Sequence, residues 1–323
     1  MQIYAFFLKG NKNIKKKCIF AYLKTSVMVP EKEQYRTLNQ IIMMNIDNLD
    51  ELIKMALRED IGDGDHSTLA CIPPTAQGTA KMVAKQDGIL CGAEVGERVF
   101  KIVDNNLKVN LLKHDGDAIA KGDIVMTIEG PSGSILTAER TALNFMQRLS
   151  GIATETHRMV DMLKGLNTQL LDTRKTTPNM RLLEKYAVKC GGGTNHRIGL
   201  YDMVMLKDNH VDFAGGIEAA IDRTRDYLKA KNKDLRIEIE VRNLDELQRV
   251  LDHGGVDRIM LDNFDPATLR EAVKRIDGKY ETEASGGIIE TTLREYAETG
   301  VDFISVGALT HHIKSLDLSL VKK

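Results

Sequence analysis

The sequence predicts an α/β protein in which a TIM-like barrel follows a smaller N-terminal domain. From Thr168 onward, short apolar runs alternate with helical patterns, which is typical of parallel strands joined by crossover helices. Nearly every one of these apolar runs is followed directly by polar residues. Because functional residues of barrels gather at the carboxyl ends of the strands, this distribution favours a barrel over a doubly wound sheet.

The composition is that of an ordinary globular protein. The 323 residues are 42% hydrophobic and 28% charged, and 45 Lys and Arg nearly balance 46 Asp and Glu, so there is no overall basic field for nucleic acid. No apolar run approaches the roughly 18 residues that a membrane-spanning helix needs. The four cysteines (Cys18, Cys71, Cys91 and Cys190) lack metal-ligand spacing, and we expect a reducing, cytoplasmic setting.

Residues 1–43 differ from the rest of the chain. They are rich in lysine, and their two short apolar stretches do not fit the layout of a secretory signal. We expect this segment to be a disordered tail or a non-native extension, with translation starting at Met43 or Met44.

Residues 44–150 are expected to form the N-terminal α/β domain. A helix is predicted over 49–57, where apolar side chains recur at helical spacing, and Asn48 with Glu51 has the pattern of a capping box. Beyond it, apolar runs separated by turn signals predict short strands. The expected strands are 80–84, 88–91, 109–112 and 124–128.

A helical pattern from Thr137 leads into the second domain. Ser150 and Gly151 are predicted to interrupt it before it continues to Leu163. Arg140 would lie in its first turn, at the positive end of the helix dipole, where a bound anion would offset the repulsion.

Residues 151–310 are expected to form the barrel. Its predicted strands are 168–171, 203–206, 236–241, 258–261, 280–284 and 303–306, and its helices begin near Pro178, Gly216, Leu244, Pro266 and Ile289. The final segment, 311–323, is expected to return to the N-terminal domain.

Cationic groups follow the first two barrel strands. They are Arg174, Lys175, His196, Arg197 and Lys207, and a glycine run, 191–193, lies among them. Because clustered cations repel one another, a fold that gathers them is expected to hold an anion.

Two glycine loops and two acids complete the predicted site. The loops, which follow the last two strands, are Ser285, Gly286 and Gly287, and Val306, Gly307 and Ala308. In barrels the loops after the final strands usually form the phosphate-binding site. Glu240 and Asp262 could bind sugar hydroxyls or a Mg²⁺ carried by a pyrophosphate. Together these groups describe a site for a phosphosugar and a second anion.

Several stretches resemble the quinolinate phosphoribosyltransferase family, also called carboxylating nicotinate-nucleotide pyrophosphorylases. The resemblance extends from about Ile46 to Leu320. It is carried by ERTALNFMQRLSGIAT (139–154), DTRKTTPNMRLLEKYAVKCGGGTNHRIGL (172–200), LKDNH (206–210), IEVRN (239–243), LDNF (261–264), EASGGI (283–288) and TGVDFISVGALTH (299–311).

The resemblance implies both a reaction and an assembly. Quinolinate and phosphoribosyl pyrophosphate would give nicotinate mononucleotide, pyrophosphate and carbon dioxide, with Mg²⁺, in the de novo route to NAD. The implied fold is an open seven-stranded α/β-barrel joined to an N-terminal α/β domain, and the implied assembly is a homodimer or a hexamer.

The resemblance also implies roles for single residues. Arg140, Arg174, His196, Arg197 and Lys207 would hold the quinolinate carboxylates, and Lys175 would lie between quinolinate and pyrophosphate. Thr173, Lys175, Glu240, Asp262 and the two glycine loops would bind phosphoribosyl pyrophosphate, with Glu240 and Asp262 near the metal. The family often has an arginine, contributed across the dimer, where this chain has Lys85; a lysine keeps the charge but loses bidentate reach.

Two other functions remain open at this point. A related phosphoribosyltransferase acting on another ring acid should need fewer cations than this cluster offers. A non-catalytic phosphosugar-binding barrel would not need Glu240 and Asp262 beside the cations.

Overall fold

The computed structural model describes residues 48–322, so the predictions for residues 1–43 lie outside the described residues. Within that range no helix is both long and apolar enough to cross a membrane.

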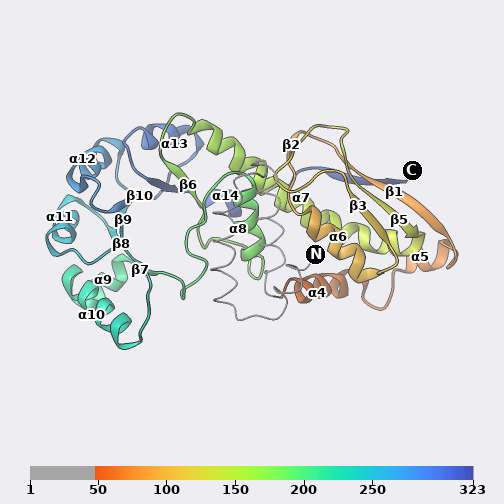
Figure 1. The fold of residues 1–323 in the computed structure, drawn as a ribbon, viewed down its shortest axis with the longest axis horizontal. Helices are drawn as coiled ribbons and strands as arrows, with labels where there is room; N and C mark the ends of the chain where they lie inside the picture. The colour runs from red at the N-terminus through yellow and green to blue at the C-terminus, as the bar shows by residue number, and fades with distance from the viewer. Residues whose placement is uncertain (1–47, 323) are drawn as a thin grey trace, which may run out of the picture. The chain divides into compact units, whose positions relative to one another are not determined.

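The N-terminal half is built on an antiparallel sheet of order β12-β1-β5-β3, beside a two-stranded β2-β4 pair (Figure 1). Its elements are α4 (Leu49–Ile61), α5 (His66–Cys71), β1 (Gln77–Ala84), β2 (Gly88–Ile89), α6 (Ala93–Val103), β3 (Lys108–Leu111), β4 (Ala118–Ile119) and β5 (Ile124–Pro131). The last strand of the chain, β12 (Leu318–Lys322), pairs antiparallel with β1. The C-terminal segment therefore lies in the N-terminal sheet.

In this half one local expectation is wrong and one helix was missed. Asn48 precedes α4 in a left-handed conformation and makes no side-chain cap, so there is no capping box. The helix α6 was not predicted, although Val95, Val99 and Phe100 form its buried face. Its short apolar runs resemble those of the neighbouring strands, so their period alone does not distinguish them.

A single helix, α7 (Ser132–Met162), replaces the predicted pair. A Cβ built on Gly151 would lie 2.4 Å from the carbonyl oxygen of Lys314, so this glycine permits close packing and does not break the helix. The Ser150 hydroxyl accepts from the Cys91 amide at 2.9 Å and donates to the Cys91 carbonyl. Because α7 begins at Ser132, Arg140 lies beyond the first turn, which corrects the dipole argument made for it.

The second half contains a parallel sheet of order β6-β11-β10-β9-β8-β7, with α10 to α13 along its outer side (Figure 1). The strands are β6 (Gln169–Leu171), β7 (Val204–Leu206), β8 (Ile237–Val241), β9 (Arg258–Asp262), β10 (Glu281–Ser285) and β11 (Phe303–Ser305). The helices are α8 (Arg181–Cys190), α9 (Asp208–Ala214), α10 (Ile217–Ala230), α11 (Leu244–His253), α12 (Pro266–Ile276), α13 (Glu290–Ala297) and α14 (Ala308–His311).

The sheet is open, because its edge strands β6 and β7 are not neighbours in the hydrogen-bonded order. The described residues form a 6-stranded sheet, so the implied seventh strand is not confirmed. At that edge an isolated parallel bridge joins Leu171 to Thr194. The helix α8 begins at Arg181 rather than at Pro178, since Asn179 adopts a left-handed φ of 64°.

Candidate active site

Side chains alternate between the two faces of each central strand, so the acidic and basic side chains gather on one face of the sheet. In β8, Ile237, Ile239 and Val241 point to one face, so Glu238 and Glu240 point to the other. In the register of the neighbouring strands, Arg258 lies opposite both Glu238 and Glu281, and Asp262 lies opposite Ser285. The concave side therefore carries Glu240, Asp262 and Ser285 near the carboxyl ends of the strands, with other charged groups beneath them.

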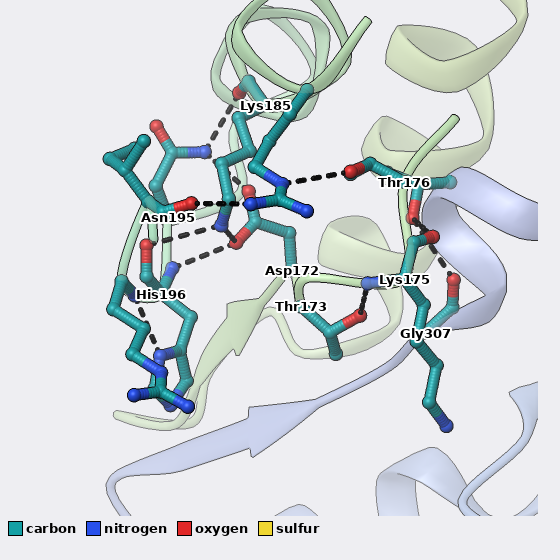
Figure 2. Close-up of polar contacts among 12 residues, drawn as sticks. Asp172, Thr173, Lys175, Thr176, Lys185, Asn195, His196 and Gly307 are labelled. Carbon is teal, nitrogen blue, oxygen red and sulfur yellow. Dashed lines mark hydrogen bonds and ion pairs between the residues drawn. The ribbon is translucent and has the colours of Figure 1, made fainter. Parts of the chain in front are cut away.

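Asp172, directly after β6, anchors the loops around the site (Figure 2). Its fully buried carboxylate accepts from Lys185 Nζ, from Asn195 Nδ2 at 2.6 Å and from the His196 amide at 2.8 Å. Burial raises the pKa of Asp172 and lowers that of Lys185, while their mutual attraction opposes both shifts. A buried ion pair is tolerable when hydrogen bonds satisfy its remaining atoms, as they do here. The contacts of Asp172 therefore hold the end of β6, α8 and the segment after the glycine run against one another.

Arg174 and Arg197 are half-buried cations that form no ion pair among the described residues. Arg174 Nε is buried without a hydrogen-bond partner. Burial, then the charge of Arg174, lowers the pKa of Arg197, while the charges of Glu238 and Asp202 oppose this shift. Two guanidinium groups that repel each other in partial burial favour the binding of an anion with more than one carboxylate.

Lys207, Glu240 and Asp262 meet at the ends of β7, β8 and β9. Lys207 Nζ lies 3.4 Å from Glu240 Oε2. Burial raises the pKa of Glu240; the charge of Lys207 opposes this shift, and that of Asp262 adds to it. Burial also raises the pKa of Asp262, against the charges of Lys207 and Lys175. The acids and lysines therefore form one electrostatic group.

Lys175 lies against the turn after β11. The Thr310 hydroxyl donates to the Lys175 carbonyl at 2.8 Å. A Cβ on Gly307 would lie 2.9 Å from Lys175 Cδ and 2.8 Å from His311 Nε2. Burial, then the charges of His312 and Lys175, lowers the pKa of His311. His311 is thus a site neighbour that the sequence did not single out.

The loop after β10 depends on its two glycines. Gly286 and Gly287 have φ of 97° and 62°, which favour glycine. A Cβ on Gly286 would lie 2.2 Å from Asn263 Oδ1, whereas one on Gly287 would meet nothing within 4 Å. The backbone at Gly287 is therefore open to a ligand.

His196 does not face the other cations. It is buried, and its Nε2 lies 3.0 Å from Glu238 and 3.2 Å from Glu283. Neither contact meets the geometry of a hydrogen bond. Nδ1 accepts from the Arg197 amide at 2.6 Å. In this structure both ring nitrogens contact the protein, and the assignment of His196 to a quinolinate carboxylate stays a prediction.

Arg140 and Lys85 lie on the N-terminal half. Arg140 is exposed on α7, and Lys85 is exposed directly after β1, where its amide donates to the Asp317 carbonyl. No ion pair joins either one to a described residue of its own chain. They are carried by different elements from Arg174, Lys175, Arg197, Lys207, Glu240 and Asp262.

A supporting ion pair was also not predicted. Arg148 of α7 binds the fully buried Glu184 of α8, and Glu184 accepts from the Thr177 amide at 3.1 Å. Arg148 also donates to the Thr177 hydroxyl and the Thr310 carbonyl. The sequence signal was a charged residue inside an apolar helix pattern, but its partner is distant in sequence.

Two family models match the chain. The model described as quinolinate phosphoribosyl transferase, C-terminal domain, matches residues 152–321, and the corresponding N-terminal domain model matches residues 65–150. Together they cover the N-terminal sheet, α7 and the parallel sheet with its loops.

Individual proteins are similar over nearly the same range. A chloroplastic carboxylating nicotinate-nucleotide pyrophosphorylase of Arabidopsis thaliana is 44% identical over 288 residues, which is 84% of this chain and 82% of that protein. A probable carboxylating nicotinate-nucleotide pyrophosphorylase of Bacillus subtilis is 43% identical over 277 residues, 86% of this chain and 94% of that protein. The solved nicotinate-nucleotide pyrophosphorylase of Francisella tularensis superposes with a TM-score of 0.79 at 40% identity, covering 86% and 96% of the two chains.

Proposed function

The chain belongs to the quinolinate phosphoribosyl transferase family, and on that premise we propose that it transfers phosphoribosyl from phosphoribosyl pyrophosphate to quinolinate. The products are nicotinate mononucleotide, pyrophosphate and carbon dioxide, which makes this a step of de novo NAD biosynthesis. The observation that supports the proposal is the pair of half-buried guanidinium groups, Arg174 and Arg197, which form no ion pair among the described residues.

Quinolinate has two adjacent carboxylates, and a single cation would not compensate for their desolvation. Arg174, Arg197 and Lys207 supply three positive charges around one face, and guanidinium forks match carboxylate geometry. We assign His196 to holding the Arg197 backbone, since its ring contacts the protein on both sides. Arg140 and Lys85 would then complete a neighbouring subunit's site in a homodimer.

Phosphoribosyl pyrophosphate would occupy the opposite side of the mouth. Thr173, Lys175 and the two loops, 285–287 and 306–308, are assigned to its phosphates, because the glycines leave the backbone accessible. Glu240 and Asp262 are assigned to the ribose hydroxyls. Both supply carboxylate oxygens, the ligands that Mg²⁺ prefers, and Asp262 raises the pKa of Glu240, a repulsion that a divalent cation would relieve. When bound, Mg²⁺ would offset charge on the leaving pyrophosphate.

The residues act by position and charge. The cations orient the quinolinate ring nitrogen towards the anomeric carbon, and the C–O bond to pyrophosphate breaks as the C–N bond forms. Glu240 and Asp262 stabilise the positive charge that develops on the ribose, and Lys175 stabilises the departing pyrophosphate. The quaternary ring nitrogen then accepts the electron pair of the breaking C–C bond, carbon dioxide leaves, and the ring carbon takes a proton.

The two alternatives make different demands on these residues. A ring acid with one carboxylate would leave part of the Arg174, Arg197 and Lys207 charge uncompensated. A non-catalytic barrel would gain nothing from Glu240 and Asp262, whose burial is unfavourable in a site that binds only anions. We also place the enzyme in the cytoplasm, in keeping with free thiols at Cys71, Cys91 and Cys190.

Carbon dioxide release from carboxyl-labelled quinolinate tests the proposal. Release should require phosphoribosyl pyrophosphate and Mg²⁺, and nicotinate should not replace quinolinate as phosphoribosyl acceptor. Turnover of nicotinate without quinolinate turnover would favour the first alternative, and binding of phosphoribosyl pyrophosphate without turnover of either acid would favour the second.

A further inference from the structure

A second cluster of ionisable groups lies outside the proposed active site. Cys91 follows β2, Asp115 lies between β3 and β4, and Cys190 ends α8. One ligand atom from each of the three residues lies within 4.8 Å of the other two. Cys91 and Asp115 are buried and Cys190 is half-buried, so segments that are distant in sequence meet at one enclosed point.

Hydrogen bonds hold the carboxylate of this cluster in place. The Ala93 amide donates to Asp115 Oδ1 at 2.7 Å, and the Tyr186 hydroxyl donates to Asp115 Oδ2 at 2.8 Å. Tyr186 and Cys190 are four residues apart on α8 and therefore share one face of that helix. Support of this kind, a carboxylate oriented by outer hydrogen bonds, is typical of metal ligands.

The acids of this cluster form no ion pair with a cationic side chain in the part of the chain that the structure describes. A second carboxyl, Glu94, lies beside Asp115, and its Oε2 is buried without a hydrogen-bond partner. Asp115 is close enough to Glu94 to act on it electrostatically. Two carboxyls and two thiols thus gather where positive charge would be favourable.

We propose that Cys91, Cys190 and Asp115 bind a Zn²⁺ ion. Two sulfur donors and one carboxylate oxygen suit zinc, whose fourth position can hold water, and soft thiolates select it over Mg²⁺. Each thiol would lose its proton on binding, because a metal ion stabilises the thiolate. The ion would tie the β2–α6 segment and the β3–β4 turn to α8, whose Lys185 holds Asp172 beside the active site.

A disulfide between Cys91 and Cys190 is the alternative for the same pair. A disulfide would make no use of the Asp115 carboxylate, whose Oδ2 accepts from Cys91 Sγ at 4.0 Å, whereas a metal ion would bind both groups. The same acidic surroundings attract a cation. An experiment can therefore distinguish a bound metal ion from a disulfide.

The test uses the full chain carrying Cys18→Ser and Cys71→Ser, so that Cys91 and Cys190 are the remaining thiols. Under a phosphine reductant, Co²⁺ is added as a spectroscopic probe, and Zn²⁺ affinity is measured by competition. We expect intense thiolate-to-cobalt absorption with tetrahedral d–d bands, and a rise in melting temperature with Zn²⁺. Adding Cys190→Ser, or separately Asp115→Asn, should weaken Zn²⁺ binding by about 10- to 100-fold or more.

Circular dichroism and turnover without added Zn²⁺ check that these variants fold. If the parent protein gives no thiolate–cobalt absorption, or if Cys190→Ser and Asp115→Asn bind Zn²⁺ as it does, the proposal is wrong. Loss of two hydrogens from the intact mass with peroxide, in a protein that binds neither metal, would identify a disulfide pair instead.

Discussion

At the scale of single residues, pairing separates structural charges from those available to a ligand. Lys185 is buried and paired with Asp172, whereas Arg174 and Arg197 form no ion pair among the described residues. A cation that is already paired inside the protein gives little to a substrate, because its charge is compensated. The unpaired groups therefore identify the anion site better than the number of cations does.

The first prediction concerns these groups. Arg174→Ala, Arg197→Ala and Lys207→Ala should each weaken quinolinate binding by about 2–5 kcal/mol, because a desolvated carboxylate loses its partner. Titration calorimetry measures the affinity, and circular dichroism should be unchanged. Arg223→Ala, an exposed position on α10, serves as the matched control. Normal affinity in all three variants would rule out the quinolinate assignment.

The second prediction concerns the pH dependence of stability. Burial disfavours the charged form of His196, but Glu238 and Glu283 overcome this and raise its pKa from 6.5 to about 9. The folded state therefore binds more protons than the unfolded state between those values. Stabilisation by His196 is complete below about pH 6.5 and is lost as the pH rises through 9.

Urea unfolding at pH 6.5 and pH 9 tests this directly. Wild-type protein should lose more unfolding free energy over that interval than His196→Asn, which cannot titrate. Glu238→Gln should fall between them, since it removes one of the two carboxylates that raise the pKa. Equal losses in wild type and His196→Asn would show that the ring does not titrate in this window.

At the scale of secondary-structure elements, close packing explains why the sequence pattern wrongly predicted a break in α7. A third prediction follows for α7. Gly151→Ala should lower stability by about 1–3 kcal/mol despite its better helix propensity, because the new methyl would lie 2.4 Å from the Lys314 carbonyl oxygen. Gly133→Ala in the same helix meets only a side-chain carbon of Thr68, at 3.2 Å, and should change stability much less. Thermal unfolding compares them, and similar effects would contradict the packing argument.

The parallel strands were predictable because each is a short apolar run that ends in polar residues. The strands β8, β9 and β10 lie within about two residues of their expected bounds. Gly151 could not be understood in this way, since only the contact with Lys314 shows why it is small. The predicted cap at Asn48 was wrong for a similar reason, because its left-handed backbone depends on the surrounding fold and not on the local sequence.

The site was predictable where residues follow strands and not where they act through distant partners. That Lys207, Glu240 and Asp262 lie close together could be predicted from their positions at strand ends. The role of Asp172 depends on Lys185 and Asn195, which a linear pattern does not pair with it. The direction of His196 depends on Glu238 and Glu283, which lie two strands apart.

At the scale of the whole molecule, the chain carries cations on both halves. Lys85 and Arg140 are exposed on the N-terminal half, whereas the unpaired guanidinium groups lie beside the parallel sheet. A second copy of the chain could bring such exposed cations to the open mouth of a barrel without any change within one chain. The homodimer proposal therefore makes a claim about which chain supplies Lys85.

The fourth prediction tests that claim by mixing two impaired proteins. Lys85→Ala and Lys207→Ala should each lower activity, and subunit exchange between them should restore part of it. In such a heterodimer, one site combines an intact barrel with the Lys85 of the other chain. If Lys85 served its own barrel, no site in the mixture would have both lysines.

The control for this mixture pairs two lesions of one barrel, Lys207→Ala and Arg174→Ala. These cannot complement each other, because every heterodimer site would lack one of the two groups. Two different affinity tags verify that subunits have exchanged before carbon dioxide release is measured. Recovery in the first mixture with none in the second supports a shared site. No recovery in either would place Lys85 in its own chain's site or outside catalysis.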